Sequence, residues 1–121
     1  MAKVIRFHET GGPEVLKIEE VATPEPKEGE VRIRVHALGL NRAESMYRSG
    51  RYVIEAQFPA TLGYEASGYI DAIGAGVTEF CIGDAVSVIP AFMFDEYGLY
   101  GDLVVAPARA VVKNPVGVSF E

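Results

Sequence analysis

Glycine and proline interrupt this chain at short intervals, and this spacing constrains its fold more than any other feature. The 121 residues include 13 glycines and 7 prolines. Both types favour turns, because glycine permits positive φ angles and proline fixes φ. The segments between them are short, which favours many chain reversals, as in a β barrel or sandwich. Since 49% of the residues are hydrophobic, the chain can bury the core of one domain spanning residues 1–121, and disorder is excluded.

The clearest strand is predicted at Val31–Ala37, where apolar residues alternate with Arg32, Arg34 and His36. A period of two indicates one buried and one solvated face. The other predicted strands are Lys3–His8, Val15–Val21, Ala66–Gly74, Ala85–Ile89, Leu99–Ala106 and Ala110–Lys113. In the second of these, we expect Leu16 and Ile18 to face inward. The predicted fold class is therefore mainly β, with about seven strands and one or two short helices.

One convincing helix is predicted, from Asn41 to Ser49. Asn41 is a favourable N-cap, and Glu44 three residues later completes a capping-box pattern. Gly50 is placed to end the helix. Residues 51–62 are predicted to form a loop rich in aromatic side chains.

Charge and cysteine content limit the partners and the compartment. Asp and Glu number 17 against 11 for Lys and Arg, giving a net charge of -6, which argues against binding to nucleic acid or anionic membranes. The sequence has no apolar run of membrane-spanning length and no signal-peptide pattern. The single cysteine, Cys81, cannot form an internal disulfide and reads as a small buried hydrophobe. We therefore expect a reducing, cytoplasmic location.

Eight short motifs together resemble the quinone oxidoreductases of the medium-chain dehydrogenase/reductase superfamily, which also contains the zinc alcohol dehydrogenases. Each is weak alone, but they occur in the family's order along nearly the whole chain. They are Phe7–Leu16, Gly29–Val31, Gly39–Asn41, Arg48–Tyr52, Gly63–Gly68, Gly74–Val77, Gly83–Val86 and Gly98–Asp102. The resemblance implies a GroES-like β-barrel catalytic domain, in agreement with the strand pattern.

The resemblance also implies a cofactor, NADPH or NADH, bound between this domain and a Rossmann domain. The Rossmann fingerprint is a glycine-rich turn between a strand and a helix, and this sequence has none, because no third glycine or helix follows Gly74-Ala75-Gly76. We therefore expect a truncated chain, inactive alone, whose partners are the missing Rossmann domain and a small hydrophobic carbonyl or quinone substrate. The family returns to its catalytic domain after the cofactor domain. An unpaired sheet edge and a homodimer are therefore further expectations.

Zinc is not expected. Zinc members of the superfamily carry Cys and His ligands where this chain has Asn41 and Tyr64. His8 and His36 fall on different predicted strands, so no set of three protein ligands remains. The family's structural zinc lobe with its four cysteines is missing as well.

The resemblance implies two catalytic residues, Asn41 and Tyr52. Asn41 matches the residue that meets the nicotinamide end of the cofactor, although it could serve only as the helix cap. Tyr52 matches a tyrosine at the mouth of the active site, and its phenol could donate a proton. The alternative for Tyr52 is a loop tyrosine packed on the barrel.

The predicted cofactor-binding residues are Asn41, Glu44, Tyr47 and Arg48. For Glu44 the alternative is a capping-box partner, for Tyr47 a core or rim residue, and for Arg48 a solvated arginine beside the cleft, as for Arg51. Tyr64 is read mainly as filling the space of a missing metal, and Glu65 as a structural hydrogen-bonding group. The aromatic segment from Phe92 to Tyr100 is either an apolar lid over the substrate or a packed loop.

The sequence therefore predicts the substrate-binding half of a zinc-independent, NAD(P)H-dependent oxidoreductase that transfers hydride to a quinone or enone. A quinone can accept hydride without a metal, because its own oxygens hold the developing charge. Alternative functions are a zinc-less alcohol dehydrogenase, an enoyl thioester reductase, or a stand-alone GroES-like binding module.

Overall fold

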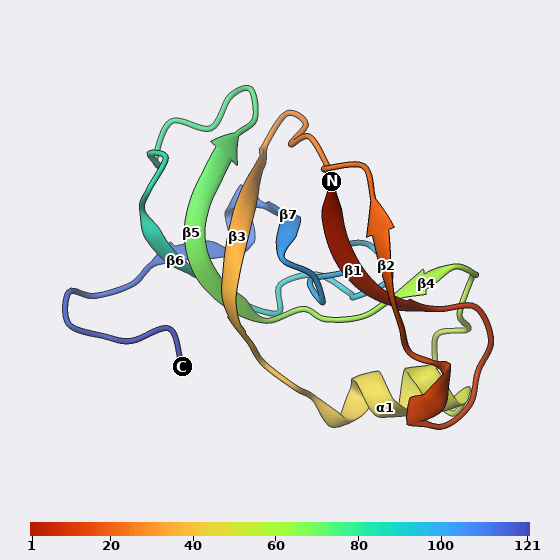
Figure 1. Cartoon of the computed structure of the whole chain (residues 1–121). Helices are drawn as coiled ribbons and strands as arrows, with labels where there is room; N and C mark the ends of the chain where they lie inside the picture. Colours follow the sequence, from red (N-terminus) through yellow and green to blue (C-terminus); the bar gives the residue numbers. More distant parts are fainter.

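The computed structural model describes all residues from Met1 to Glu121 as two β sheets with one short α-helix beneath them (Figure 1). The sheets contain eight strands. The strands are β1 (Ala2–Phe7), β2 (Lys17–Val21), β3 (Glu30–Leu38), β4 (Ala60–Thr61), β5 (Ala66–Ile73), β6 (Ala85–Val88), β7 (Leu103–Pro107) and β8 (Val111–Lys113). The helix is α1 (Arg42–Ser49), and two 3-10 turns lie at Pro13–Val15 and Ala108–Ala110.

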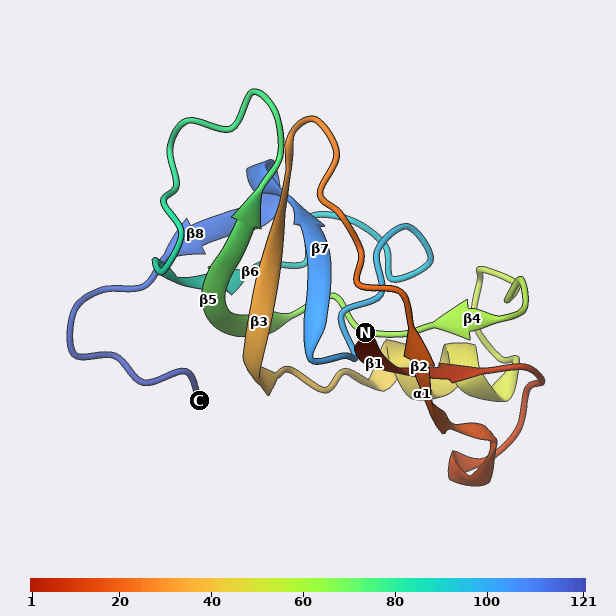
Figure 2. The same cartoon turned by 45° about the horizontal axis from the view of Figure 1, so that its top comes forward.

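All strand pairs are antiparallel, and the predicted mainly β fold class is confirmed. The order is β2-β1-β4 in the small sheet and β7-β3-β5-β6-β8 in the large one; Figure 2 shows β8 and β7 on either side of β5 and β3. The sheets meet at a bridge between Val4 and Gly101. Next to this bridge the Ile5 N–H donates to the Tyr100 carbonyl at 2.8 Å. The chain between Leu99 and Asp102 therefore runs beside β1. The strand predicted at Leu99–Ala106 begins only at Leu103, as β7.

The alternation predicted for β3 is present. Val31 and Ile33 are fully buried, whereas Arg32 and Arg34 lie on the other face and pair with Asp71 at 2.8 and 3.3 Å. One face of β3 thus lines the hydrophobic core and the other carries its arginines, as period-two alternation requires.

The interior consists of two hydrophobic clusters. The large one lies within the five-stranded sheet and the chain around Phe92 and Leu99, and the small one gathers Phe7, Tyr47 and Phe94 beside α1. Leu38 and Tyr64 pack against both clusters. No helix is long and apolar enough to span a membrane.

Some predictions about the small sheet and its surroundings were wrong. Ile18 is 73% exposed, because β2 is an edge strand and no segment covers the apolar depression of about 310 Å³ that Ile18 lines with Val35 and Leu38. Val15 belongs to a 3-10 turn instead of the strand. Residues 60–61, predicted as loop, pair with the end of β1.

The position predicted for Cys81 was also wrong. Its side chain is exposed. The residue lies in the turn before β6, where its N–H donates to the Asp84 carboxylate at 2.8 Å. This turn holds the backbone at the surface, so the thiol does not reach either core.

Candidate functional site

Asn41 and Glu44 open helix α1 as their spacing predicts. Asn41 has extended backbone geometry, and its N–H donates to Glu44 Oε1 at 2.6 Å. Gly50 ends the helix with φ of 80°, a left-handed conformation in which glycine has no Cβ penalty. The capping roles of Asn41 and Glu44 are therefore confirmed, and they fix both side chains at one end of the sheets.

The Asn41 side chain faces a second motif. Its Nδ2 donates to Glu65 Oε2 at 2.7 Å, while the Gly39 N–H donates to the Glu65 carbonyl at 3.0 Å. A Cβ on Gly39 would lie 2.8 Å from the Glu65 Cβ, so only glycine allows this approach. The Gly39–Asn41 and Gly63–Gly68 motifs thus meet in space, and Glu65 has the hydrogen-bonding role expected of it.

Glu44 is the buried acid of this site. Its side chain is 2% exposed, and Oε1 also accepts a hydrogen bond from the Tyr100 hydroxyl at 3.0 Å. Burial raises the pKa of Glu44, and the nearby charge of Glu65 raises it further, against the lowering by hydrogen bonds from Asn41 and Tyr100. Burial and the neighbouring Glu44 together raise the pKa of Tyr100. Nothing local in the sequence links residues 44 and 100, and Tyr100, predicted only as part of the aromatic segment, was not predicted to contact Glu44.

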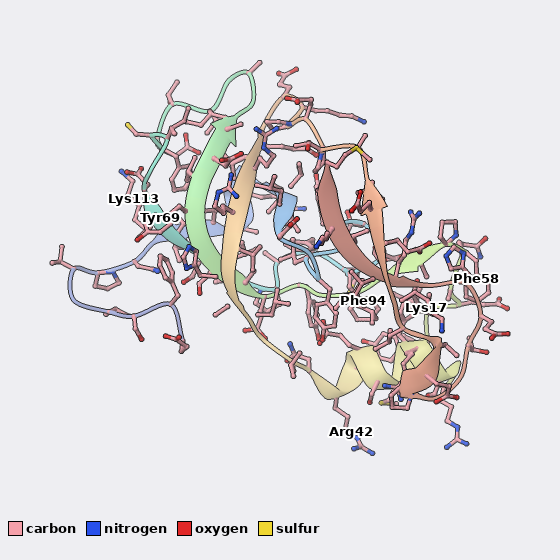
Figure 3. All side chains as sticks on the ribbon, in the orientation of Figure 1. Lys17, Arg42, Phe58, Tyr69, Phe94 and Lys113 are labelled. Carbon is pink, nitrogen blue, oxygen red and sulfur yellow. The ribbon has the colours of Figure 1, made fainter.

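Aromatic rings form one wall of the site around Phe94. The Phe94 centroid lies 4.6, 5.3 and 5.7 Å from those of Tyr47, Tyr64 and Tyr52, and Figure 3 places Phe94 between α1 and the strands. Phe92, Phe94 and Tyr100 are all buried in the two clusters. Of the two alternatives for this segment, the structure supports the packed loop over the lid.

The three candidate tyrosines differ in accessibility. Tyr52 is half-buried and lines a depression of about 640 Å³ with Thr10, Val53 and Phe58. Tyr64 is half-buried between the two clusters, and burial, followed by the charge of Glu44, raises its pKa. This position agrees with Tyr64 as a filler.

Tyr47 lies in the small cluster, where 2% of it is exposed. Burial and the charge of Asp95 raise the pKa of its phenol. The structure thus favours Tyr47 as a core residue. Contact between Tyr47 and a cofactor stays a prediction.

Arg48 lies at a cationic depression of about 580 Å³ on the outer side of α1, together with Arg42 and Arg51. None of these three arginines has a carboxylate within 4.0 Å. Arg48 Nε donates to the Gly11 carbonyl at 3.1 Å and so attaches the helix to the glycine turn before Pro13. Arg42, which sequence reasoning missed, extends away from the sheets (Figure 3). The helical spacing of Arg42, Ser45 and Ser49 could have revealed this face.

The donor set does not fit catalytic zinc. No three His, Cys, Asp or Glu side chains lie close enough to hold a metal ion. Asn41 engages Glu65 instead, His8 contacts Glu19 at 2.8 Å, and the His36 ring stacks 4.8 Å from that of Phe120.

The fold and the motifs define a GroES-like domain, and comparison with known proteins gives its family. Residues 27–116, more than half of the chain, match the alcohol dehydrogenase GroES-like domain. The chain therefore belongs to this family.

The relatives agree with the resemblance found in the sequence. The chain is 40% identical to a quinone oxidoreductase of Pseudomonas aeruginosa over 121 residues, covering 100% of this chain and 36% of the relative. Among solved structures, the human synaptic vesicle membrane protein VAT-1 homolog-like protein superposes with a TM-score of 0.89 at 32% identity, covering 98% of this chain and 37% of that one. Escherichia coli quinone oxidoreductase in complex with NADPH gives 0.86 at 31% identity, covering 98% and 35%. The chain thus spans about a third of the length of these proteins.

Proposed function

We propose that this chain forms the substrate-binding half of a zinc-independent, NAD(P)H-dependent oxidoreductase that transfers hydride to a quinone or an enone. The observation that carries the proposal is the group of polar and aromatic side chains at the start of α1, where Asn41 bridges Glu44 and Glu65. The quinone oxidoreductases among the relatives support the same reaction class.

The residues fit a dinucleotide cofactor in two ways. The cationic depression with Arg42, Arg48 and Arg51 suits phosphate groups, because guanidinium groups pair with phosphate oxygens. Asn41 offers an amide and Tyr52 a phenol for the nicotinamide end of the cofactor. Glu44 holds Asn41 in position, and Tyr47 belongs to the aromatic wall around Phe94. When bound, the cofactor supplies the hydride.

The protein's part in this reaction is electrostatic. Hydride addition leaves negative charge on the acceptor oxygen, and a hydroxyl donor such as Tyr52 would stabilise that charge and give it a proton. Phe58 and Val53 beside Tyr52 provide an apolar surface for a planar acceptor.

The test replaces the matching segment of the Pseudomonas aeruginosa relative with this chain and measures NADPH and NADH oxidation. The panel contains 1,4-benzoquinone, an enone, an enoyl thioester and a primary alcohol with the oxidised cofactor. We expect turnover with the quinone or enone, and no change after treatment with a metal chelator. Activity that requires added zinc, or that appears only with the alcohol or thioester, would overturn the proposal.

Tyr52→Phe in this chimera removes the proposed donor and should lower kcat by about 10²-fold. Tyr69→Phe, on the exposed side of β5, is the matched control and should leave kcat unchanged. Equal rates for the two variants would remove Tyr52 from the mechanism.

A further inference from the structure

The chain leaves the large sheet after β8 and returns to it at Phe120. Asn114 is still attached to β6, because its N–H donates to the Ala85 carbonyl at 2.9 Å and its side chain accepts from the Ser87 hydroxyl at 2.6 Å. Residues 115–119 are all exposed, and Figure 1 shows this segment swinging away from the sheet before it turns back. Phe120 is half-buried again. The exposed segment is therefore held at both of its ends.

Three contacts hold Phe120 on the outer face of the large sheet. Its ring centroid lies 4.8 Å from that of His36 and 4.9 Å from that of Tyr69, separations typical of attractive aromatic pairs. Tyr69 lies on β5 beside the C-terminal segment (Figure 3). The Ser67 hydroxyl, on a residue that is only 6% exposed, donates to the Phe120 carbonyl at 2.5 Å. Phe120 thus completes an aromatic cluster and also satisfies a buried hydroxyl.

Strand β3 is irregular at the place where Phe120 docks. Val35 pairs with Gly68 on β5, and the next pair along the two strands is Ala37 with Ser67. His36, between them, has no partner on β5 and is the extra residue of a β-bulge. A bulge bends a strand locally and redirects its side chains. The irregularity of the sheet therefore coincides with the residue that stacks on Phe120.

The docking place of Phe120 adjoins the candidate site. A depression of about 210 Å³ is lined by Phe120 and Glu121 together with Gly39 and Glu65. Glu65 is the acid that accepts the hydrogen bond from Asn41 Nδ2. The chain that passes Phe120 is therefore brought next to the polar side chains at the start of α1.

We propose that Phe120 is a clamp that sets where the cofactor domain lies relative to Asn41. This inference rests on the proposed function, in which a Rossmann domain outside the 121 residues holds the cofactor. Domains joined by an exposed linker move relative to each other unless contacts restrain them. Residues 115–119 have the character of such a linker, since they are exposed and include Pro115 and Gly117. Docked Phe120 ends this linker at a fixed point, so it is a positioning residue that acts through the placement of the cofactor domain.

Nuclear Overhauser contacts in the 121-residue chain test the docking by itself. We expect cross-peaks from the ring protons of Phe120 to those of His36 and Tyr69. Val118→Ala, at a 59% exposed side chain of the same segment, is the control and should leave these cross-peaks unchanged. A wild-type chain without them would overturn the proposal, whatever reaction the intact protein catalyses.

Small-angle X-ray scattering of the chimera with the Pseudomonas aeruginosa relative tests the placement of the domains. Phe120→Ala releases the end of the linker, so we expect a larger radius of gyration than for the wild-type chimera. Val118→Ala should match the wild type. The same radius for all three proteins would show that Phe120 does not restrain the domains, and the proposal would fail.

Kinetics of the same chimera separate positioning from stability. Phe120→Ala should lower kcat/KM for NADPH by about 10²-fold, because hydride transfer depends steeply on the placement of the donor. The KM for the quinone, which binds beside Tyr52 within this domain, should change little. Phe120→Tyr keeps the ring and should restore the wild-type values, and Tyr69→Phe likewise leaves the ring contacts intact.

The outcomes distinguish the clamp from the proposed function. A Phe120→Ala chimera that is less stable to urea but keeps the wild-type kcat/KM for NADPH would reduce Phe120 to a structural role and overturn the clamp. A wild-type chimera that reduces neither quinones nor enones would overturn the proposed function. In that case the Overhauser contacts and the radius of gyration still decide whether Phe120 restrains the two domains.

Discussion

Asn41 connects two segments through one residue, with its backbone N–H on Glu44 and its side-chain amide on Glu65. The backbone bond follows from local spacing and was predicted. The amide bond spans 24 positions in the sequence, so no local pattern indicates it. Because the side-chain amide donates to the Glu65 carboxylate, an asparagine at this position does more than cap the helix.

Asn41→Asp tests this distinction. Aspartate is as good an N-cap as asparagine, yet here it replaces a donor to Glu65 with a third acid. We expect a loss of about 1–3 kcal/mol of unfolding free energy at neutral pH, measured by urea denaturation. Asn41→Ser, a neutral cap, is the control, and the gap between the two variants should close in acid as the carboxyls protonate. An Asp variant as stable as wild type would contradict the bridging role.

At the scale of elements, α1 is held by contacts from distant segments. Arg48 attaches it to the Gly11 turn, and Phe94 packs on the ring of Tyr47 at 4.6 Å. The helix has only eight residues, too few for stability in isolation. Its position, and with it that of Asn41 and Glu44, depends on the segment between β6 and β7.

Phe94→Ala should therefore destabilise the domain strongly. Phe94 is completely buried, and removing its ring leaves a cavity costing about 3–5 kcal/mol, measured as the shift in urea unfolding. Val53→Ala, at a side chain that is 91% exposed, is the control and should change stability by less than about 0.5 kcal/mol. A loss below about 1 kcal/mol at Phe94 would show that the loop is not part of the core.

For the whole molecule, the unpaired strand edges bear on assembly. β2, β4, β7 and β8 each end a sheet, and such edges can pair with another chain. We predict a concentration-dependent homodimer of this chain, which light scattering after size-exclusion chromatography would detect. Salt should favour the dimer, because the net charge of -6 opposes association of like chains. A monomer at all concentrations and salt levels would contradict this prediction.

The elements predicted correctly are those with strong local patterns. β3 follows from strict alternation and α1 from its cap residues and Gly50, because both depend on neighbours within a few positions. The family motifs likewise indicated the GroES-like fold. Predictions from weak patterns were wrong. Ile18 was expected to face inward, but a short strand does not define by its sequence which of its faces is buried.

The sequence by itself determined the turns, most strands, the helix and the family, because steric preferences and side-chain periodicity act locally. Only the tertiary structure decided which side chains form the site. It brought Tyr100 to Glu44 across 56 positions, placed Tyr47 in the core, and left one oxygen of Glu44 buried without a partner. The burial of a side chain and its hydrogen-bond partners depend on how distant segments pack together. These two features of the environment set the pKa of a buried acid such as Glu44.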